Sequence, residues 1–263
     1  MLAFPNAKIN LGLNVTGTRN DGYHDLETVL FPIAFRDVLE IVPLEGDEPA
    51  FQSTGLAIPG KQEENLCLKA YRLLKAERLF PAVKMHLHKV IPMGAGLGGG
   101  SSDAAFAIKL LNELFALGLT PNQMKHFAGI LGSDCAFFIE NKAVYACGRG
   151  DQFEPVTISL AGYTLMVIIP PVHVSTPEAY RHVKLKKPAE NIRVILEADP
   201  REWKNRLVND FEESVFPQFP EILQIKEKLY DAGAVYASMS GSGSAVYGLF
   251  DHDPPKPDHF RDH

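Results

Sequence analysis

The stretch Pro92-Met93-Gly94-Ala95-Gly96-Leu97-Gly98-Gly99-Gly100-Ser101-Ser102-Asp103-Ala104-Ala105 decides how this chain is interpreted. Five glycines fall between positions 94 and 100, and two serines follow where an amphipathic helix pattern begins. Glycines let backbone N–H groups turn toward a ligand with no Cβ in the way. The first turn of a helix adds unpaired N–H donors and a partial positive charge. Together these features predict an anion site, most often for phosphate, so we expect a protein that handles a nucleotide.

Other glycine-loop types fit the stretch less well. A P-loop is excluded because no lysine precedes the serines. Gly94, Gly96 and Gly99 match GxGxxG, but a dinucleotide fold needs a following strand and an acidic residue about 20 positions on. Here a second helix pattern follows, and nothing around residue 119 is acidic. A plain surface turn without a ligand rarely needs this many glycines before a helix.

Composition and charge restrict the kind of partner. The 263 residues are 46% hydrophobic and 22% charged, with a net charge of −6, as in an ordinary globular protein. This acidic balance disfavours nucleic acid and anionic membranes. Cys67, Cys135 and Cys147 lack metal-ligand spacing and indicate reduced thiols. Because no signal-peptide pattern and no apolar run of about 18 residues is found, we expect a cytoplasmic protein.

Hydrophobic periodicity predicts an α+β fold with antiparallel sheets and helices packed on them. Turn signals separate the predicted elements, and Pro170-Pro171 marks the approach to a second lobe. We expect strands at 7–15, 26–42, 83–91, 143–147, 163–169 and 234–250, the last interrupted by a turn at 241–243, and helices at 64–79, 101–117, 120–132 and 221–232.

Three motifs in order resemble those of the GHMP kinase superfamily. The glycine loop is similar to its second motif, Pro5-Asn6-Ala7-Lys8-Ile9-Asn10-Leu11 to its first, and Met239-Ser240-Gly241-Ser242-Gly243-Ser244-Ala245 to its third. The resemblance implies a two-lobed fold with an N-terminal ribosomal-S5-domain-2-like lobe and a C-terminal ferredoxin-like α/β lobe. We place these lobes at residues 1–155 and 156–250, followed by a flexible tail at 251–263.

Narrower features resemble one subgroup of that superfamily. They are Ala7–Leu13, the segment Arg19-Asn20-Asp21-Gly22-Tyr23-His24-Asp25-Leu26-Glu27-Thr28, and Gly132–Phe138, in which Ala136 stands where the subgroup pattern has proline. The subgroup uses ATP to phosphorylate a hydroxyl of a small molecule that carries a cytidine diphosphate group. That reaction belongs to the non-mevalonate route to isoprenoid precursors.

Asp134 and Lys8 are the predicted catalytic residues. Phosphoryl transfer to an alcohol needs positioning, charge neutralisation and a group that accepts the hydroxyl proton. Asp134 follows a helix-ending glycine beside the apolar run 135–139, so its carboxylate is a candidate base in a partly desolvated setting. Without the resemblance, Asp134 is more simply a cap or turn residue, and Lys8 a solvated strand lysine. The resemblance makes Lys8 the cation that orients Asp134.

ATP, expected as its Mg²⁺ complex, is the predicted cofactor. The resemblance implies that the serines donate to the β- and γ-phosphates and that one of them touches Mg²⁺, although both also suit a plain helix N-cap. No acidic metal ligand is assigned, because the helix position of Asp103 can turn it elsewhere. The predicted nucleotide-binding residues are Pro92, Gly94, Ala95, Gly96, Leu97, Gly98, Gly99, Gly100, Ser101 and Ser102.

The predicted substrate contacts follow from the same resemblance. Tyr23 stacks on the cytosine and His24 hydrogen-bonds it, whereas Thr176 contacts the substrate and Tyr180 stacks on the other face of the base. Asn10 completes the set. Base stacking on an aromatic ring contributes about 1–3 kcal/mol. Taken alone, a Tyr-His pair is usually just a surface turn.

Two other functions are weighed against this one. Another kinase of the superfamily, acting on homoserine or mevalonate, has no use for a cytosine pocket. A non-catalytic binding protein is opposed by the negative net charge and by the Lys8 and Asp134 pair. Binding to RNA would show a salt-dependent shift. His86, His88, His173 and His182 have no metal-type arrangement, and we expect a monomer or homodimer that binds a small molecule.

Overall fold

The computed structural model describes residues 1–186 and 188–255, and its mixture of sheets and helices confirms the α+β class. The chain forms two compact units. Unit 1 consists of residues 1–8, 32–93 and 98–142, and unit 2 of residues 9–31, 94–97 and 143–263. Strands β2 (Asn6–Thr18) and β3 (His24–Arg36) contribute residues to both. Among the described residues, no helix is long and apolar enough to cross a membrane.

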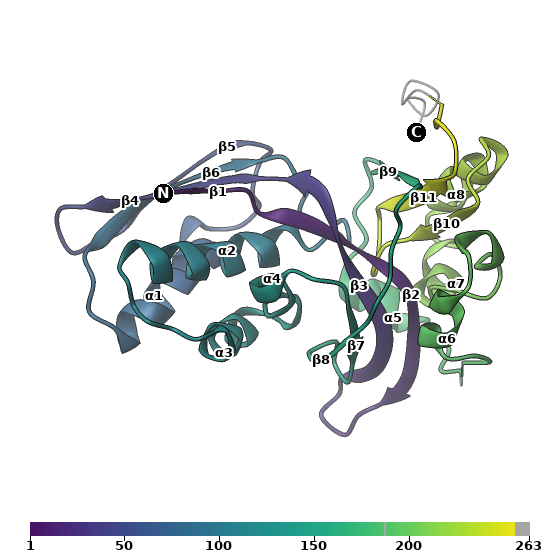
Figure 1. Cartoon of the computed structure of the whole chain (residues 1–263), viewed down its shortest axis with the longest axis horizontal. Helices are drawn as coiled ribbons and strands as arrows, with labels where there is room; N and C mark the ends of the chain where they lie inside the picture. The colour runs from purple at the N-terminus through teal and green to yellow at the C-terminus, as the bar shows by residue number, and fades with distance from the viewer. Residues whose placement is uncertain (187, 256–263) are drawn as a thin grey trace. The chain divides into compact units, whose positions relative to one another are not determined.

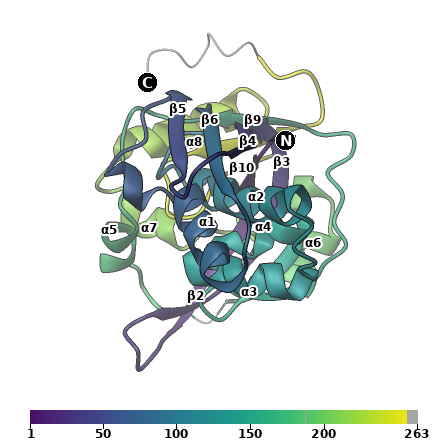
Figure 2. The ribbon, with the colours of Figure 1, turned by 90° about the vertical axis from the view of Figure 1, so that its left-hand side faces the viewer.

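Unit 1 is a four-stranded sheet with helices on one face. Figure 1 shows its strands as one layer. Their hydrogen-bonded order is β1 (Leu2–Ala3), β4 (Val38–Leu44), β6 (Ala82–Lys89) and β5 (Ala50–Gly55). Only β5 runs parallel to its neighbour, β6. Figure 2 shows α1, α2 and α3 close together, and these three helices contact one another. The unit's helices are η1 (Gln62–Glu64), α1 (Leu66–Glu77), α2 (Gly99–Leu114), α3 (Pro121–Leu131), η2 (Ser133–Cys135) and α4 (Phe137–Glu140).

Unit 2 contains two further sheets. One has the order β2-β3-β7-β8, with β7 at Val144–Cys147 and β8 at Gln152–Pro155. The other has the order β10-β11-β9, formed by Tyr236–Met239, Val246–Phe250 and Thr164–Ile168. A buried apolar cluster that includes Leu13, Phe211 and Ile225 packs its strands against its helices. The unit's helices are α5 (Thr176–Arg181), α6 (Ile192–Glu197), η3 (Pro200–Glu202), α7 (Phe211–Val215) and α8 (Pro220–Asp231).

Two predicted boundaries are wrong, and both errors lie next to the glycine loop. The strand expected at 26–42 is two strands that separate at Asp37, a residue with 0% of its surface exposed. The helix expected from Ser101 begins at Gly99, after the left-handed Gly98. Gly98 occupies the cap position, so neither Ser101 nor Ser102 is the helix N-cap.

The other predicted helices and strands are present, with small shifts of their ends, but several short elements were not predicted. These are β1, β5, β8, α4, α5, α6, α7 and the three short 3₁₀ segments. The predicted lobes at 1–155 and 156–250 stay a prediction, and part of the predicted tail, residues 256–263, lies outside the described residues.

We predict that Gly55→Ala lowers the free energy of unfolding by about 2–3 kcal/mol. Gly55 has a φ of +80°, and a Cβ there would meet the Lys89 carbonyl oxygen at 2.2 Å. Because that oxygen already accepts the Leu56 N–H at 2.8 Å, it cannot move aside freely.

Gly129→Ala is the matched control for that measurement. Gly129 lies inside α3 with no atom within 4 Å of the new Cβ, so its replacement should stabilise the protein by about 0.5–1 kcal/mol. Urea unfolding followed by circular dichroism measures both variants. Equal midpoints for Gly55→Ala and the wild type would contradict the close contact.

Candidate active site

Lys8 and Asp134, the two predicted catalytic residues, form an ion pair within unit 1. Lys8 Nζ lies 3.6 Å from Asp134 Oδ2. Lys8 lies on β2 with 4% of its side chain exposed, whereas Asp134 lies in η2 with 33% exposed. Burial lowers the pKa of Lys8, and the Asp134 carboxylate opposes that shift by favouring the ammonium form. The pair therefore joins a shielded cation to a carboxylate that remains accessible.

The turn that carries Asp134 has a backbone that proline would also fit at position 136. Ala136, which stands where that pattern has proline, has a φ of −64°. Proline imposes nearly this value, so the alanine leaves the path of the chain unchanged.

The N-terminus of α2 lies directly against Lys8. Gly98 has a φ of +70°, and a Cβ there would approach Lys8 Cγ at 3.2 Å and the Phe138 ring at 3.0 Å. No side chain caps the helix, and its first intrahelical bond runs from Ser102 N to Gly98 O at 2.9 Å. The N–H groups of Gly99, Gly100 and Ser101 precede that bond and have no intrahelical acceptor. This end of the helix can therefore accept an anion next to a buried ammonium.

The two loop serines lie in different surroundings. Ser101 is partly buried and hydrogen-bonds the Cys135 thiol, whose pKa burial raises to about 11 against the effect of that bond. Ser102 is fully buried, and its hydroxyl has no hydrogen-bond partner in the structure. Ser101 is therefore the serine nearer to the surface, and Ser102 lies within the first turn facing the interior.

The earlier half of the loop belongs to unit 2, where it packs against the third motif. Ser240 Oγ donates to Gly96 O at 2.9 Å, and Ala245 N donates to Ala95 O at 3.1 Å. A Cβ on Gly96 would lie 2.0 Å from Ser240 O. Residues on both sides of the 241–243 turn therefore hydrogen-bond the glycine loop. Ala95 and Leu97 are buried, so only their backbone groups can face a ligand.

Three buried charges lie beneath the first turn of α2 and were not predicted. Lys89 Nζ donates to Asp37 Oδ2 at 2.5 Å and to Asp103 Oδ2 at 2.7 Å. Asp37 Oδ1 also accepts the N–H groups of Val90 and Ile91, at 2.6 and 2.8 Å. In the sequence, Lys89 stands at the end of an apolar strand pattern. A lysine in that position is usually exposed to solvent, so the pattern alone did not predict a buried ion pair. Asp103 is turned toward Lys89 and is not placed as a metal ligand.

The surroundings of Asp103 in this triad raise the pKa of its carboxyl. Burial raises the pKa of its carboxyl to about 7, with Lys89 lowering it and Asp37 raising it further. Its Oδ1 atom has no hydrogen-bond partner. One ammonium between two carboxylates therefore favours a proton on Asp103 near neutral pH.

A cavity of about 360 Å³ in unit 1 borders the same helix end. Its lining includes Asn65, Met93, Gly100 and Asp103, together with polar residues of β5 and the segment after it. Asn65 caps α1 by accepting the Cys67 N–H at 2.8 Å, which fixes the wall of the cavity.

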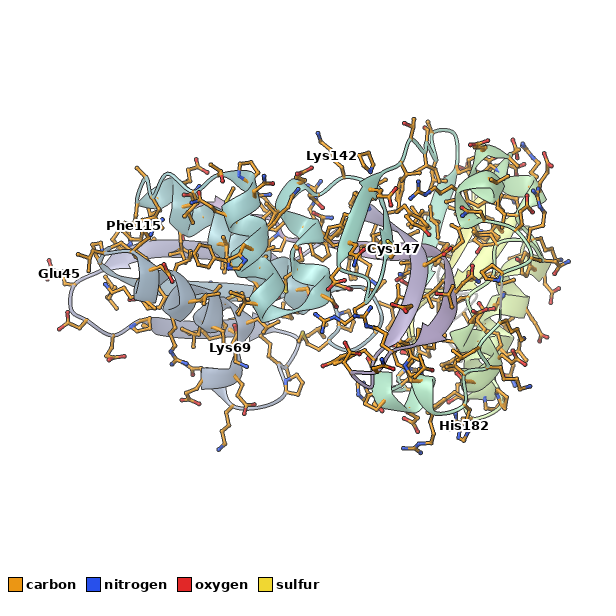
Figure 3. All side chains as sticks on the ribbon, turned by 90° about the horizontal axis from the view of Figure 1, so that it is seen from below. Glu45, Lys69, Phe115, Lys142, Cys147 and His182 are labelled. Carbon is orange, nitrogen blue, oxygen red and sulfur yellow. The ribbon has the colours of Figure 1, made fainter. Side chains whose placement is uncertain are left out.

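Unit 2 brings several of the predicted substrate residues together. His24 stacks on Tyr180, with ring centroids 4.7 Å apart and an interplanar angle of 25°. Thr176, the first residue of α5, lies 3.4 Å from Ser242 of the third motif through their hydroxyl oxygens. His182, labelled in Figure 3, follows α5 directly. The ring of Tyr23 instead lies beside Arg149, which sequence reasoning missed.

Asn10 is more buried than expected for its predicted role in substrate binding. Only 4% of the residue is exposed, and its side-chain amide donates to Thr28 Oγ1 at 3.0 Å. Its backbone oxygen accepts the Tyr247 hydroxyl at 2.7 Å. A direct role for Asn10 in substrate binding stays a prediction.

The described residues contain no group of three or more histidine, cysteine or acidic side chains that could hold a metal ion. A Mg²⁺ ion commonly arrives with a nucleotide, held by its phosphates and by one or two protein oxygens. The loop fits such a nucleotide-carried ion better than a dedicated protein cage. His86 and His88 both lie 3.0 Å from the Thr54 hydroxyl, without a third ligand.

Family models match both parts of the chain. Residues 65–142 match the GHMP kinases N terminal domain, and residues 189–258 match the GHMP kinases C terminal model. The 4-diphosphocytidyl-2-C-methyl-D-erythritol kinase of Parabacteroides distasonis is 51% identical over 262 residues, covering 100% of this chain and 94% of that protein. The Bacteroides fragilis protein of the same name is 53% identical over 252 residues, covering 95% and 92%.

Solved structures agree with these matches. A crystal structure of 4-(cytidine 5'-diphospho)-2C-methyl-D-erythritol kinase superposes with a TM-score of 0.83 at 34% identity, covering 100% of this chain and 93% of that one. The mevalonate kinase of Methanococcus jannaschii gives 0.70 at 14% identity, covering 95% and 90%, and so shares the fold.

We predict that Asp103→Asn changes how stability depends on pH. A carboxyl whose pKa is raised from about 3.8 to about 7 on folding stabilises the protein fully at low pH, and this contribution is lost as pH rises through 7. Asparagine, which resembles the protonated acid, removes that loss. Relative to the variant, the wild type should therefore lose stability between about pH 4 and pH 7 and change little above that. Urea unfolding midpoints across about that range measure the difference, and parallel profiles would contradict the prediction.

Proposed function

Because the chain belongs to the GHMP kinase family, and within it to the 4-diphosphocytidyl-2-C-methyl-D-erythritol kinases, we propose that it phosphorylates the 2-hydroxyl of 4-diphosphocytidyl-2-C-methyl-D-erythritol. ATP supplies the phosphoryl group, and the reaction serves the non-mevalonate route to isoprenoid precursors. The observation that carries the chemistry is the Lys8 and Asp134 ion pair, 3.6 Å long, beside the start of α2.

Asp134 is the proposed base. Its carboxylate is accessible enough to meet a hydroxyl group, and the Lys8 ammonium lies 3.6 Å from it. As the hydroxyl oxygen attacks the γ-phosphorus, the bond from that phosphorus to the bridging oxygen breaks, ADP leaves, and Asp134 takes the hydroxyl proton. Lys8, almost fully buried, neutralises negative charge that develops on the transferred group.

The glycine loop is the proposed phosphate site. The N–H groups of Gly99, Gly100 and Ser101, which have no intrahelical acceptor, offer donors to the phosphates, and the helix dipole favours the phosphate charge. The neighbouring cavity beside Asn65 and Met93 suits the adenosine part of ATP. Mg²⁺, when bound with ATP, neutralises phosphate charge, and the Ser101 hydroxyl is the protein oxygen we place beside it.

The aromatic residues of unit 2 are the proposed site for the cytosine. Tyr23 offers an exposed ring for stacking, His24 offers ring nitrogens for hydrogen bonding, and Tyr180 offers a second ring. Thr176 completes the proposed contacts. Since His24 already stacks on Tyr180, a base that uses that face of Tyr180 has to displace the imidazole.

We further propose that the enzyme works in the cytoplasm as a monomer or homodimer on its small-molecule substrate, without a nucleic acid partner. Its three cysteines are free thiols, two of them buried, which fits a reducing compartment.

ADP release from Mg·ATP tests the substrate directly. Three acceptors are compared: 4-diphosphocytidyl-2-C-methyl-D-erythritol, 2-C-methyl-D-erythritol 4-phosphate and homoserine. Turnover with the first alone is expected, because only that acceptor carries the base. Turnover with homoserine instead would keep the kinase chemistry and refute the cytosine site.

We predict that Asp134→Asn lowers kcat by about 100-fold to 10,000-fold, because the variant loses the proton acceptor while its amide keeps the same shape. The KM for ATP should change little. Steady-state kinetics with the cytidylated acceptor measures both constants.

Ser133→Ala is the control for that variant. The Ser133 hydroxyl lies 3.5 Å from Asp134 Oδ1, at the limit of a hydrogen bond, so its loss should leave kcat within a few-fold of the wild type. A folded Asp134→Asn enzyme with wild-type turnover would refute the assignment of the base.

A further inference from the structure

The tip of the β2–β3 hairpin presents Tyr23 with 57% of its surface exposed. Its backbone is held firmly: Arg19 N donates to Tyr23 O at 2.8 Å, and Tyr23 N donates to Asp21 Oδ1 at 3.1 Å. These bonds fix the main chain, but they leave the orientation of the ring to other contacts. An exposed aromatic side chain has to lose rotational freedom before it stacks on a ligand, and that loss weakens binding.

A second hairpin turn carries the residue that contacts the Tyr23 ring. Cys147, labelled in Figure 3, ends β7, and the turn at 148–151 that follows it leads into β8. Leu26 N, near the start of β3, donates to Gly148 O at 2.8 Å, which fastens this turn to the hairpin that carries Tyr23. Gly150 N closes the turn on Cys147 O at 3.1 Å.

Arg149 projects from this turn over the Tyr23 ring. Its guanidinium carbon lies 5.0 Å from the ring centroid, within the range of a cation–π contact. Asp151 Oδ2 accepts from Arg149 Nε and Nη2 at 3.4 and 3.3 Å, which holds the guanidinium from the side. A planar cation on one face of Tyr23 favours one ring orientation and leaves the opposite face available for a base.

We propose that Arg149 is a positioning residue for the cytidine part of the acceptor, acting through Tyr23. The inference rests on the proposed function, because it needs Tyr23 to stack on the base. Arg149 orients the ring before the acceptor arrives, so it strengthens acceptor binding without taking part in phosphoryl transfer. Its loss changes recognition of the acceptor and leaves ATP recognition unaffected.

A double-mutant cycle tests the coupling between the two residues. Arg149→Met should raise the KM for the cytidylated acceptor by roughly two- to fivefold, as expected for an exposed cation–π contact. Both kcat and the KM for ATP should stay unchanged. In a Tyr23→Leu background the same substitution should have no effect, and Arg149→Lys, which keeps a cation, should recover most of the loss.

Arg193→Met is the matched control. Arg193 lies over the Tyr145 ring at 3.9 Å, also in unit 2 and also an arginine on a tyrosine, but it has no proposed part in binding. Its substitution should leave the acceptor KM unchanged. Calorimetric titration with cytidine diphosphate gives a readout that is independent of turnover, and Arg149→Met should weaken this binding by a similar factor.

Two results would overturn the proposal. An unchanged acceptor KM in Arg149→Met would refute any role for Arg149, and an equal effect with and without Tyr23 would show that Arg149 does not act through that ring. Failure of the proposed function has a different signature: the wild type would neither use the cytidylated acceptor nor bind cytidine diphosphate, and both proposals would then fall.

Discussion

The ammonium of Lys89, held between Asp37 and Asp103, fixes the part of unit 1 on which the phosphate site depends. It joins the end of β6, the residue between β3 and β4, and Asp103 of α2. Removing Lys89 would leave buried carboxylate charge without a compensating cation, which costs about 3–5 kcal/mol. The ion cluster therefore holds these three segments together. The start of α2 keeps its position relative to β6, the strand that leads into the glycine loop.

The loop glycines are needed for packing within the protein as well as for ligand binding. Gly96 lies against the Ser240 carbonyl oxygen, Gly98 against Lys8 and Phe138, and a Cβ on Gly99 would lie 2.9 Å from Lys89 Nζ. Each glycine lets a different part of the protein approach the loop. The loop is therefore glycine-rich partly because protein atoms leave no room for side chains there. This crowding holds the N–H groups of the loop in place before any phosphate arrives.

Sequence reasoning could predict features that repeat or that depend on local chemistry. Helices with a regular apolar stripe, such as α2, are of this kind. The Lys8 and Asp134 pair is not local, and it could be predicted only through the family resemblance. The break at Asp37 was out of reach, because its cause is a lysine 52 residues away. The stacking of His24 on Tyr180 likewise depends on tertiary packing, which no local pattern contains.

Helix α2 begins without a side-chain cap, since Gly98 has none to offer. In the proposed nucleotide complex the phosphates complete the first turn in place of a serine or aspartate side chain. The nucleotide then acts as a structural part of the fold, and the folded state gains stability in proportion to the logarithm of nucleotide concentration. Product release then removes the groups that complete this first turn, so the nucleotide-free protein should be the less stable of the two states.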